Sequence, residues 1–283
     1  MKKLTLFAAV AALTLAVQAQ TETQGQPGVV INKASTTTAL AESVEKSEVK
    51  SMNKLTEPMD KALSGVITRS EKFTVLERGP ELNKLLDEPT RLGDALQLSE
   101  NDYAIFIKLD HFLDKREKRQ IGGRIYDIRI LQLTGFVKIV GGIKANILAE
   151  SDVVISVESE PTQKSDSLEI LLPKLTRKFA AQSAEKLLDL KFPMMVEEVM
   201  DGVITIDRGE DFLTKGEKVE IYGPSRQVTN ARTGKTSERK GTLLGSATII
   251  SVEPNYAQAK ADGKYDVPDL SEVRKIKNPE SEE

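Results

Sequence analysis

One short stretch carries the residue types that acid–base or metal chemistry uses, namely Asp110, His111 and Asp114. Imidazole and carboxylate groups together could move protons or ligate a divalent metal. Residues 103–112 have the pattern of a β-strand, in which successive side chains point to opposite faces. Asp110 and His111 therefore cannot converge while the strand is regular, and His111 is the only histidine in the chain. We interpret this stretch as a strand end that meets a charged turn, and we predict no metal and no cofactor.

Other known catalytic and phosphate-binding motifs require residue spacings that this sequence does not have. A single histidine beside acidic residues does not form a Ser–His–Asp arrangement. The glycine pairs at 122–123 and 141–142 lack the spacing of a phosphate-binding loop and precede no helix start, so we interpret them as turns. Adjacent carboxylates such as Glu210 and Asp211 are present, but nothing in the sequence marks them as buried. We predict that the protein is not an enzyme, with a carboxylate-based hydrolase as a remote alternative.

Cationic side chains gather in two stretches, a predicted charged turn at residues 114–123 and a predicted polar loop at residues 223–241. In the loop, five cations stand against one acid, Glu238. Such patches attract anionic partners, here a lipid headgroup, lipopolysaccharide, peptidoglycan or an acidic protein. The alternative is a solvated loop that keeps the protein soluble. The candidate interaction surface is Lys115, Arg116, Lys118, Arg119, Arg226, Arg232, Lys235, Arg239 and Lys240.

The first 19 residues are predicted to be a cleaved secretory signal peptide. A charged start, Met1-Lys2-Lys3, precedes an apolar run over 4–17, and small residues stand before the expected cleavage site. The run is too short to span a bilayer. Because the chain has no cysteine, we do not expect a lipoprotein. We expect an exported protein, periplasmic or associated with the outer membrane, for which nucleic acid is an unsuitable partner.

The amino-acid composition limits which interactions can stabilise the fold. Without cysteine there are no disulfides, so an exported chain must rely on a hydrophobic core. The apolar fraction of 39% and the length suit one medium domain and one small one. The predicted division is a flexible linker at 20–28, an α+β domain at 29–191, a small β-barrel at 192–263 and a disordered tail at 264–283.

The first domain is predicted to hold an antiparallel sheet of three or more strands, packed by two long helices. Apolar residues recur at helical spacing over 45–69 and again over 168–190. Strands are expected at 103–112, 124–140 and 147–158, joined as a meander.

Residues 72–88 are predicted to lie at the centre of this domain as a strand, a sharp turn and a short helix. The strand would end at a charged pair that caps it or forms an ion pair, or alternatively makes an interface contact. Proline after the glycine would start the helix. The motif consists of Phe73, Val75, Glu77, Arg78, Gly79, Leu82 and Leu85.

The second domain begins after Phe192-Pro193. Asp201-Gly202 lies between two apolar runs, which is the strongest short-range signal for a β-hairpin. Further short strands at 217–222, 243–252 and 256–261 bring the total to about five, a spacing typical of a small barrel.

This order of elements resembles two known families. The Phe73–Arg78 stretch with the leucines behind it is similar to the periplasmic domain of the curli-assembly CsgG family and of TolB amino-terminal domains. The second half, with Gly209, Gly216 and Gly241, resembles the small barrel of the flagellar assembly protein FlgT. The resemblance spans about residues 29–263.

The resemblance implies an exported, non-enzymatic assembly or adaptor protein. Its partners would be other envelope proteins of a secretion, surface-appendage or cell-wall complex, including other copies of itself. The alternative is a ring-forming outer-membrane secretion channel. Lipid-facing strands should alternate apolar and polar residues, yet Asp127 and Arg129 share a face with Leu131, which favours the adaptor.

Overall fold

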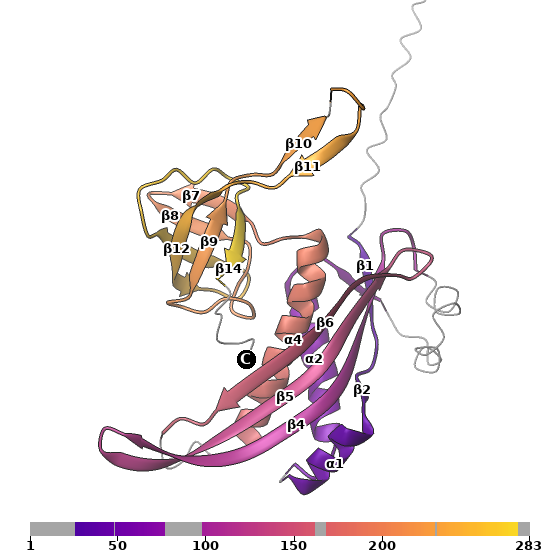
Figure 1. Cartoon of the computed structure of the whole chain (residues 1–283), viewed down its shortest axis with the longest axis vertical. Helices are drawn as coiled ribbons and strands as arrows, with labels where there is room; N and C mark the ends of the chain where they lie inside the picture. The colour runs from indigo at the N-terminus through magenta and orange to yellow at the C-terminus, as the bar shows by residue number, and fades with distance from the viewer. Residues whose placement is uncertain (1–25, 48, 77–97, 162–167, 230, 277–283) are drawn as a thin grey trace, which may run out of the picture.

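The computed structural model describes residues 26–47, 49–76, 98–161, 168–229 and 231–276. The α+β class predicted from the sequence is confirmed. An α+β domain and a smaller all-β domain follow each other along the chain, as Figure 1 shows. In the described part, no helix combines the length and apolar character needed to cross a bilayer. The predicted signal peptide and the motif residues Glu77, Arg78, Gly79, Leu82 and Leu85 lie outside the described residues.

The sheet of the first domain is mixed rather than purely antiparallel, with strand order β3-β1-β4-β5-β6. β1 (Gly28–Ile31) runs parallel to both β3 (Thr74–Leu76) and β4 (Tyr103–Ile121), and β2 (Ser35–Thr36) also pairs with β4. β4, β5 (Arg124–Gly141) and β6 (Asn146–Glu158) form an antiparallel meander.

The predicted central strand is in fact at the edge of this sheet. β1 lies between β3 and β4, because the fully buried Val29 and its neighbours supply a short apolar strand whose pairing the local pattern did not reveal. Phe73 is nevertheless buried and meets Tyr103 and Phe192 edge to face, at centroid distances of 5.8 and 5.3 Å. The half-buried Val75 packs against the same core.

Helices cover one face of the sheet, and the main core fills the space between them (Figure 1). They are α1 (Thr38–Lys46), α2 (Asn53–Arg69) and α4 (Leu168–Lys191). The predicted helix at 45–69 is wrong in its first two turns. Ser47 caps α1 through hydrogen bonds to the Val44 carbonyl, and Lys50 has φ +55°, a left-handed conformation that interrupts a helix.

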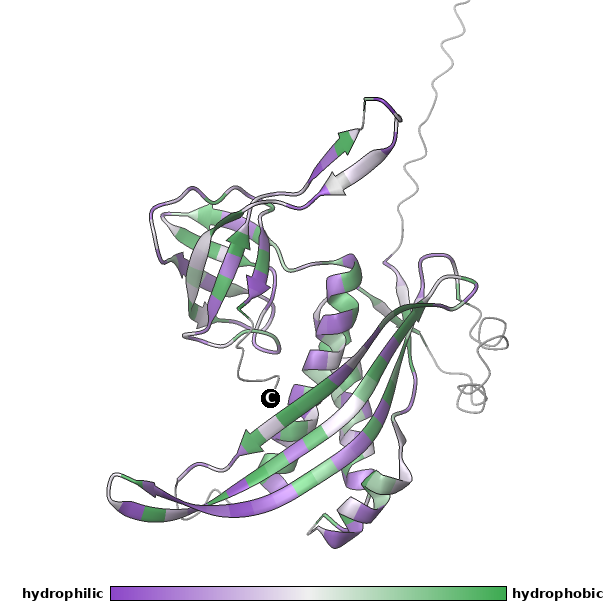
Figure 2. Cartoon of the chain, viewed as in Figure 1, coloured by the Kyte–Doolittle hydropathy of each residue, from purple (hydrophilic) through white to green (hydrophobic). Residues whose placement is uncertain are grey.

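The predicted charged turn at 114–123 is also wrong, because these residues continue β4 as far as Ile121. Only Gly122 and Gly123 form the turn, with φ +57° and +79°, as a two-residue type I′ hairpin requires. β6 ends opposite Ile130, so the hairpin beyond that point has two strands and projects from the body (Figure 1). Hydrophilic and hydrophobic residues alternate in short blocks along it (Figure 2).

The second domain contains a six-stranded sheet in the order β14-β9-β12-β13-β8-β7. The strands are β7 (Val196–Met200), β8 (Val203–Ile206), β9 (Lys218–Tyr222), β12 (Leu243–Val252), β13 (Ala257–Ala261) and β14 (Glu272–Lys275). Asp201 and Gly202 have φ +52° and +76° in the turn between β7 and β8.

This sheet closes on itself through the last strand. Met195 bridges to Glu272, and backbone bonds of 2.8 Å join the Val196 amide to Ser271 and the Val273 amide to Met194. The prediction of a disordered tail from residue 264 is therefore wrong for β14. A four-residue strand in a charged sequence gives little local signal, and it is fixed by long-range pairing and by the burial of Val273.

Candidate functional site

The Asp110, His111 and Asp114 group does not form a site. The register of β4 against β5 shifts between Leu109 and His111, so Asp110 lies at a bulge, and His111 is exposed. Asp114 accepts hydrogen bonds from Arg129 at 2.9 and 2.6 Å. Throughout the described ranges, no three histidine, cysteine, aspartate or glutamate side chains gather as metal ligands would.

Arg129 is a buried cation that the sequence analysis did not identify as part of a pair. Its side chain is 2% exposed and its partner Asp114 is 8% exposed. Its amide donates to the Ser159 hydroxyl at 3.0 Å. Alternation places Arg129 on the same face of β5 as Leu131, which belongs to the main core. A buried cation is costly unless it is paired, so the pair holds the base of the projecting hairpin in register.

The first cationic cluster is partly neutralised. Arg119 donates to Glu158 at 2.6 and 3.0 Å and to Glu117 at 2.5 Å, which ties β4 to β6. Lys115 lies 3.6 Å from Glu117. These hydrogen bonds lower the pKa of Glu158, with the bonds from Arg119 as the main cause. Lys118, in contrast, is exposed and makes no ion pair with any residue that the structure describes.

The second cationic cluster lies on a separate hairpin, so the predicted polar loop at 223–241 is wrong in its structure. β10 (Arg226–Thr229) and β11 (Thr236–Arg239) pair antiparallel as a two-stranded sheet of their own. We call residues 224–240 the arm. It projects away from the barrel, at the end of the molecule opposite the β4–β5 hairpin (Figure 1).

The neck of the arm, where Gly223 meets Gly241 and Thr242, explains why the FlgT-like motif has a glycine at position 241. A Cβ on Gly241 would lie 1.6 Å from the carbonyl oxygen of Gly223. The Gly223 amide donates to the Thr242 carbonyl at 2.9 Å. The two backbone segments that form the neck are thus in contact, and only glycine fits at position 241.

The arm holds two arginines directly opposite each other. Arg226 pairs in register with Arg239, and both are exposed. Like charges at opposite positions destabilise a hairpin. Neither guanidinium group has a hydrogen bond or an ion pair with any part of the chain that the structure describes. The strand register therefore places two guanidinium groups opposite each other on the surface, where they are open to an external anion.

The remaining cations extend this surface. Lys240 follows Arg239 directly, and Lys235 lies near the far end of the arm; both are exposed, as is Arg232. Each described side chain of the arm is exposed, with the half-buried Val228 as the exception. The structure thus gathers the second predicted group on one hairpin and keeps it apart from the first.

Ion pairs join the two domains. The Asp211 side chain is 3% exposed, and it accepts hydrogen bonds from Arg69 of α2, at 2.5 and 2.9 Å, and from Arg177 of α4, at 3.1 and 3.2 Å. Arg177 also reaches Glu210 at 2.9 Å. These hydrogen bonds, first of all those to Asp211, raise the pKa of Arg177. The carboxylates at 210 and 211, a remote candidate for catalysis, are engaged in this interdomain joint.

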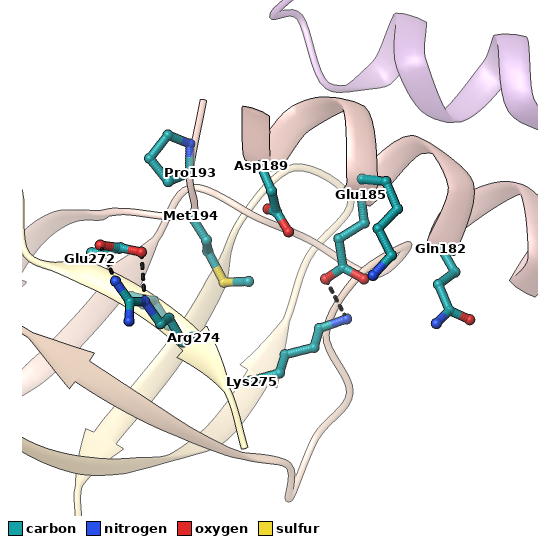
Figure 3. A pocket seen from close by; sticks show the side chains of 10 residues that line it. Gln182, Glu185, Asp189, Pro193, Met194, Glu272, Arg274 and Lys275 are labelled. Carbon is teal, nitrogen blue, oxygen red and sulfur yellow. Dashed lines mark hydrogen bonds and ion pairs between the residues drawn. The ribbon is translucent and has the colours of Figure 1, made fainter. Parts of the chain in front are cut away.

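A groove of about 470 Å3 lies between α4 and β14 (Figure 3). Lys275 pairs with Glu185 at 2.7 Å across it. Arg274 donates to Glu272 at 2.6 and 2.8 Å and stacks over Tyr222.

Asp189 stands out among the groove residues. It is exposed at the end of α4, but its carboxyl points into the groove (Figure 3). Its pKa is raised from 3.8 to about 6, chiefly because the surrounding protein excludes water and secondly because Glu185 is negatively charged. Shifts of this kind occur at functional sites and in structural ion networks alike. Here Glu185 is paired with Lys275 and Glu272 with Arg274, as in a structural joint.

Comparisons with known proteins identify no family. No family model matches the chain, and no curated protein matches it. The hypothetical protein CT253 from Chlamydia trachomatis is similar in shape, with TM-score 0.39, 8% identity, and coverage of 58% of this chain and 97% of that one.

Two further solved structures are described as lipoproteins. GNA1162 from Neisseria meningitidis has TM-score 0.32 and 12% identity, and covers 56% of this chain and 98% of its own. The rare lipoprotein B from Shewanella oneidensis has TM-score 0.27 and 11% identity, with coverages of 56% and 94%. Scores and identities this low carry no inference about function. The resemblance to the CsgG and FlgT families stays a prediction.

Proposed function

We propose that this protein is an exported, non-enzymatic adaptor of the cell envelope that docks on an acidic protein partner through its arm. The observation that carries the proposal is the exposed Arg226–Arg239 pair. A two-stranded hairpin is marginally stable by itself, and a like-charged pair weakens it further. An anionic partner bridging the two guanidinium groups would offset that cost, because arginine binds carboxylates with two parallel hydrogen bonds.

The joint between the domains supports an adaptor role. Asp211 holds both α2 and α4 against the second domain, and Arg208 donates to the carbonyl of Phe192, the residue that follows α4. An adaptor needs a fixed geometry between its binding surfaces. The joint supplies such a geometry between the arm and the first domain.

The projecting hairpin favours an adaptor over the ring-forming channel. One of its faces carries Arg116, Lys118 and Asp127, and the other carries Glu117 and Arg119. Charged side chains thus occur on both faces of the two-stranded part. A strand that faced lipid would need one apolar face.

The proposal is tested with the mature chain, from residue 20 onward, immobilised and exposed to an envelope extract from the native organism. Three proteins are compared: the wild type, the double variant Arg226→Gln/Arg239→Gln, and the control Lys215→Gln/Lys260→Gln. The control removes the same charge from exposed residues outside the arm. We expect one or more acidic proteins to be retained by the wild type and the control and to be lost with the arm variant.

A second measurement fixes the point of contact. A photo-crosslinking amino acid at Thr236, within β11, should link to the retained protein, and the same group at Lys260 should not. Retention of the same proteins by the arm variant would refute the proposal. A closed, ring-sized particle of the purified chain in light scattering would favour the channel instead.

A further inference from the structure

We propose that the tip of the β4–β5 hairpin is a membrane-docking element that inserts into the interface of an anionic phospholipid bilayer. The tip comprises residues 118–125, where β4 turns into β5. This proposal concerns the opposite end of the molecule from the arm (Figure 1), and it does not rest on the adaptor function.

The end of the hairpin exposes two large apolar side chains beside Gln120 and Arg124. Ile125 is 71% exposed and Ile121 is 44% exposed. Between them, Gly122 and Gly123 have no side chains, and a Cβ built on either would meet no atom within 4 Å. The last turn of the hairpin is therefore a narrow apolar wedge with open space around it.

The placement of the two isoleucines indicates how the wedge would be used. Ile121 stands opposite Arg124, and Ile125 stands opposite Gln120. These two pairs are neighbours in the ladder, so the isoleucines lie on opposite faces of the ribbon. Apolar surface at the end of a ribbon, rather than along one face, suits insertion end-on. A bilayer interface accepts such an insertion, whereas a flat protein surface would cover only one of the two side chains.

Cations surround the wedge. Residues 115–127 hold five basic side chains and two acidic ones. Lys118 and Arg124 are exposed, and neither has an ion pair within the described ranges. Long basic side chains can lay their aliphatic stems along an apolar insertion and keep the charge at headgroup level. Each such charge strengthens binding to an anionic surface by about fivefold.

The combination of basic and apolar side chains at the tip indicates which kind of partner it binds. A lipid phosphate in solution would satisfy the cations but would leave the isoleucines in water. A neutral bilayer would bury the isoleucines but would not satisfy the cations. An anionic bilayer satisfies both, so we commit to phosphatidylglycerol-type surfaces as the occupant.

Tryptophan fluorescence offers a direct test, because the chain contains no tryptophan. The variant Ile125→Trp places the only tryptophan at the tip. The matched control is Ile143→Trp, at a residue that is 66% exposed in the turn between β5 and β6. Both are prepared in the mature chain and mixed with vesicles of equal parts phosphatidylglycerol and phosphatidylcholine. We expect a blue shift, and quenching by acyl-brominated lipid, for Ile125→Trp only.

Sedimentation with the same vesicles measures the affinity. Relative to the wild type, Ile121→Asp/Ile125→Asp should bind at least about tenfold more weakly, and Ile143→Asp should bind equally well. Vesicles of phosphatidylcholine alone should not sediment the wild type, and free glycerol phosphate should not compete. Circular dichroism confirms that each variant is folded.

Three results would overturn the proposal. One is an unchanged emission of Ile125→Trp in vesicle-bound protein. Another is an equal loss of affinity in Ile121→Asp/Ile125→Asp and Ile143→Asp. The third is binding to soluble polyglutamate as tight as binding to vesicles, with no blue shift, which would assign the tip to an acidic protein.

Discussion

Replacing Arg239 by glutamate should stabilise the arm while it abolishes partner binding. Arg226 and Arg239 are directly opposite in the β10–β11 register and are exposed. The Arg239→Glu change converts a repulsive cross-strand pair into an attractive one. When a binding site is held in an unfavourable arrangement, a substitution that relieves the repulsion is expected to stabilise the protein and to weaken binding.

The magnitude follows from the geometry. An oppositely charged cross-strand pair contributes about 0.2–1 kcal/mol, and a like-charged pair is destabilising by a comparable amount. The swing on Arg239→Glu is therefore about 1 kcal/mol. It should be felt almost entirely within the arm, because β10 and β11 form a separate sheet whose side chains are mostly exposed.

Amide hydrogen exchange followed by mass spectrometry measures this effect in peptides that cover residues 224–240. A local stabilisation of about 1 kcal/mol slows exchange about fivefold. Lys260→Glu makes the same change in net charge on β13 and should leave exchange in the arm unaltered. Faster or unchanged exchange in Arg239→Glu would refute the inference that the two guanidinium groups repel each other across the ladder.

Four further substitutions test the joint between the domains, the groove beside α4 and the packing of the second domain. Asp211→Asn should cost about 2 kcal/mol in urea unfolding because it weakens charge-assisted bonds at a buried carboxylate, whereas Glu210→Gln, at a half-exposed pair, should cost less than about 0.5 kcal/mol. Asp189→Asn should leave stability unchanged at pH 4 and raise it by about 1 kcal/mol at pH 7.5, after allowance for solvent screening. In the folded state the pKa of Asp189 is raised to about 6, so its ionisation destabilises the protein as the pH rises through 4–6; equal effects at both pH values would contradict this. Gly209→Ala should cost about 3 kcal/mol, since a Cβ there would lie 2.1 Å from the Pro254 carbonyl oxygen; an unfolding midpoint equal to that of the wild type would contradict this packing.

The sequence by itself determined the elements whose signals are local. The leucine and phenylalanine spacing of α4 predicted that helix, because one apolar stripe must face a core. Asp201 and Gly202 predicted the β7–β8 hairpin, because few residues adopt positive φ in succession. Alternation along β5 placed Arg129 on the same face as Leu131, and both side chains are buried in the structure.

Tertiary structure decided the elements that are made by distant partners. Residues 114–121 are rich in charge and were interpreted as a turn, yet they are a strand because β5 pairs with every one of them and Arg119 reaches Glu158 of β6. β14 exists because it pairs antiparallel with β9 along its whole length and because the Val273 amide donates to the Met194 carbonyl. Neither partner is visible within a short window of sequence.

The candidate sites divide in the same way. The sequence named the cations of both interaction surfaces, because charge is a property of composition. Only the fold placed Arg226 opposite Arg239 and put Ile121 and Ile125 on opposite faces of the ribbon, since cross-strand register depends on how two segments pair and not on either segment alone. Only the fold, likewise, brought Arg69 and Arg177 to Asp211, because that joint exists where two domains meet.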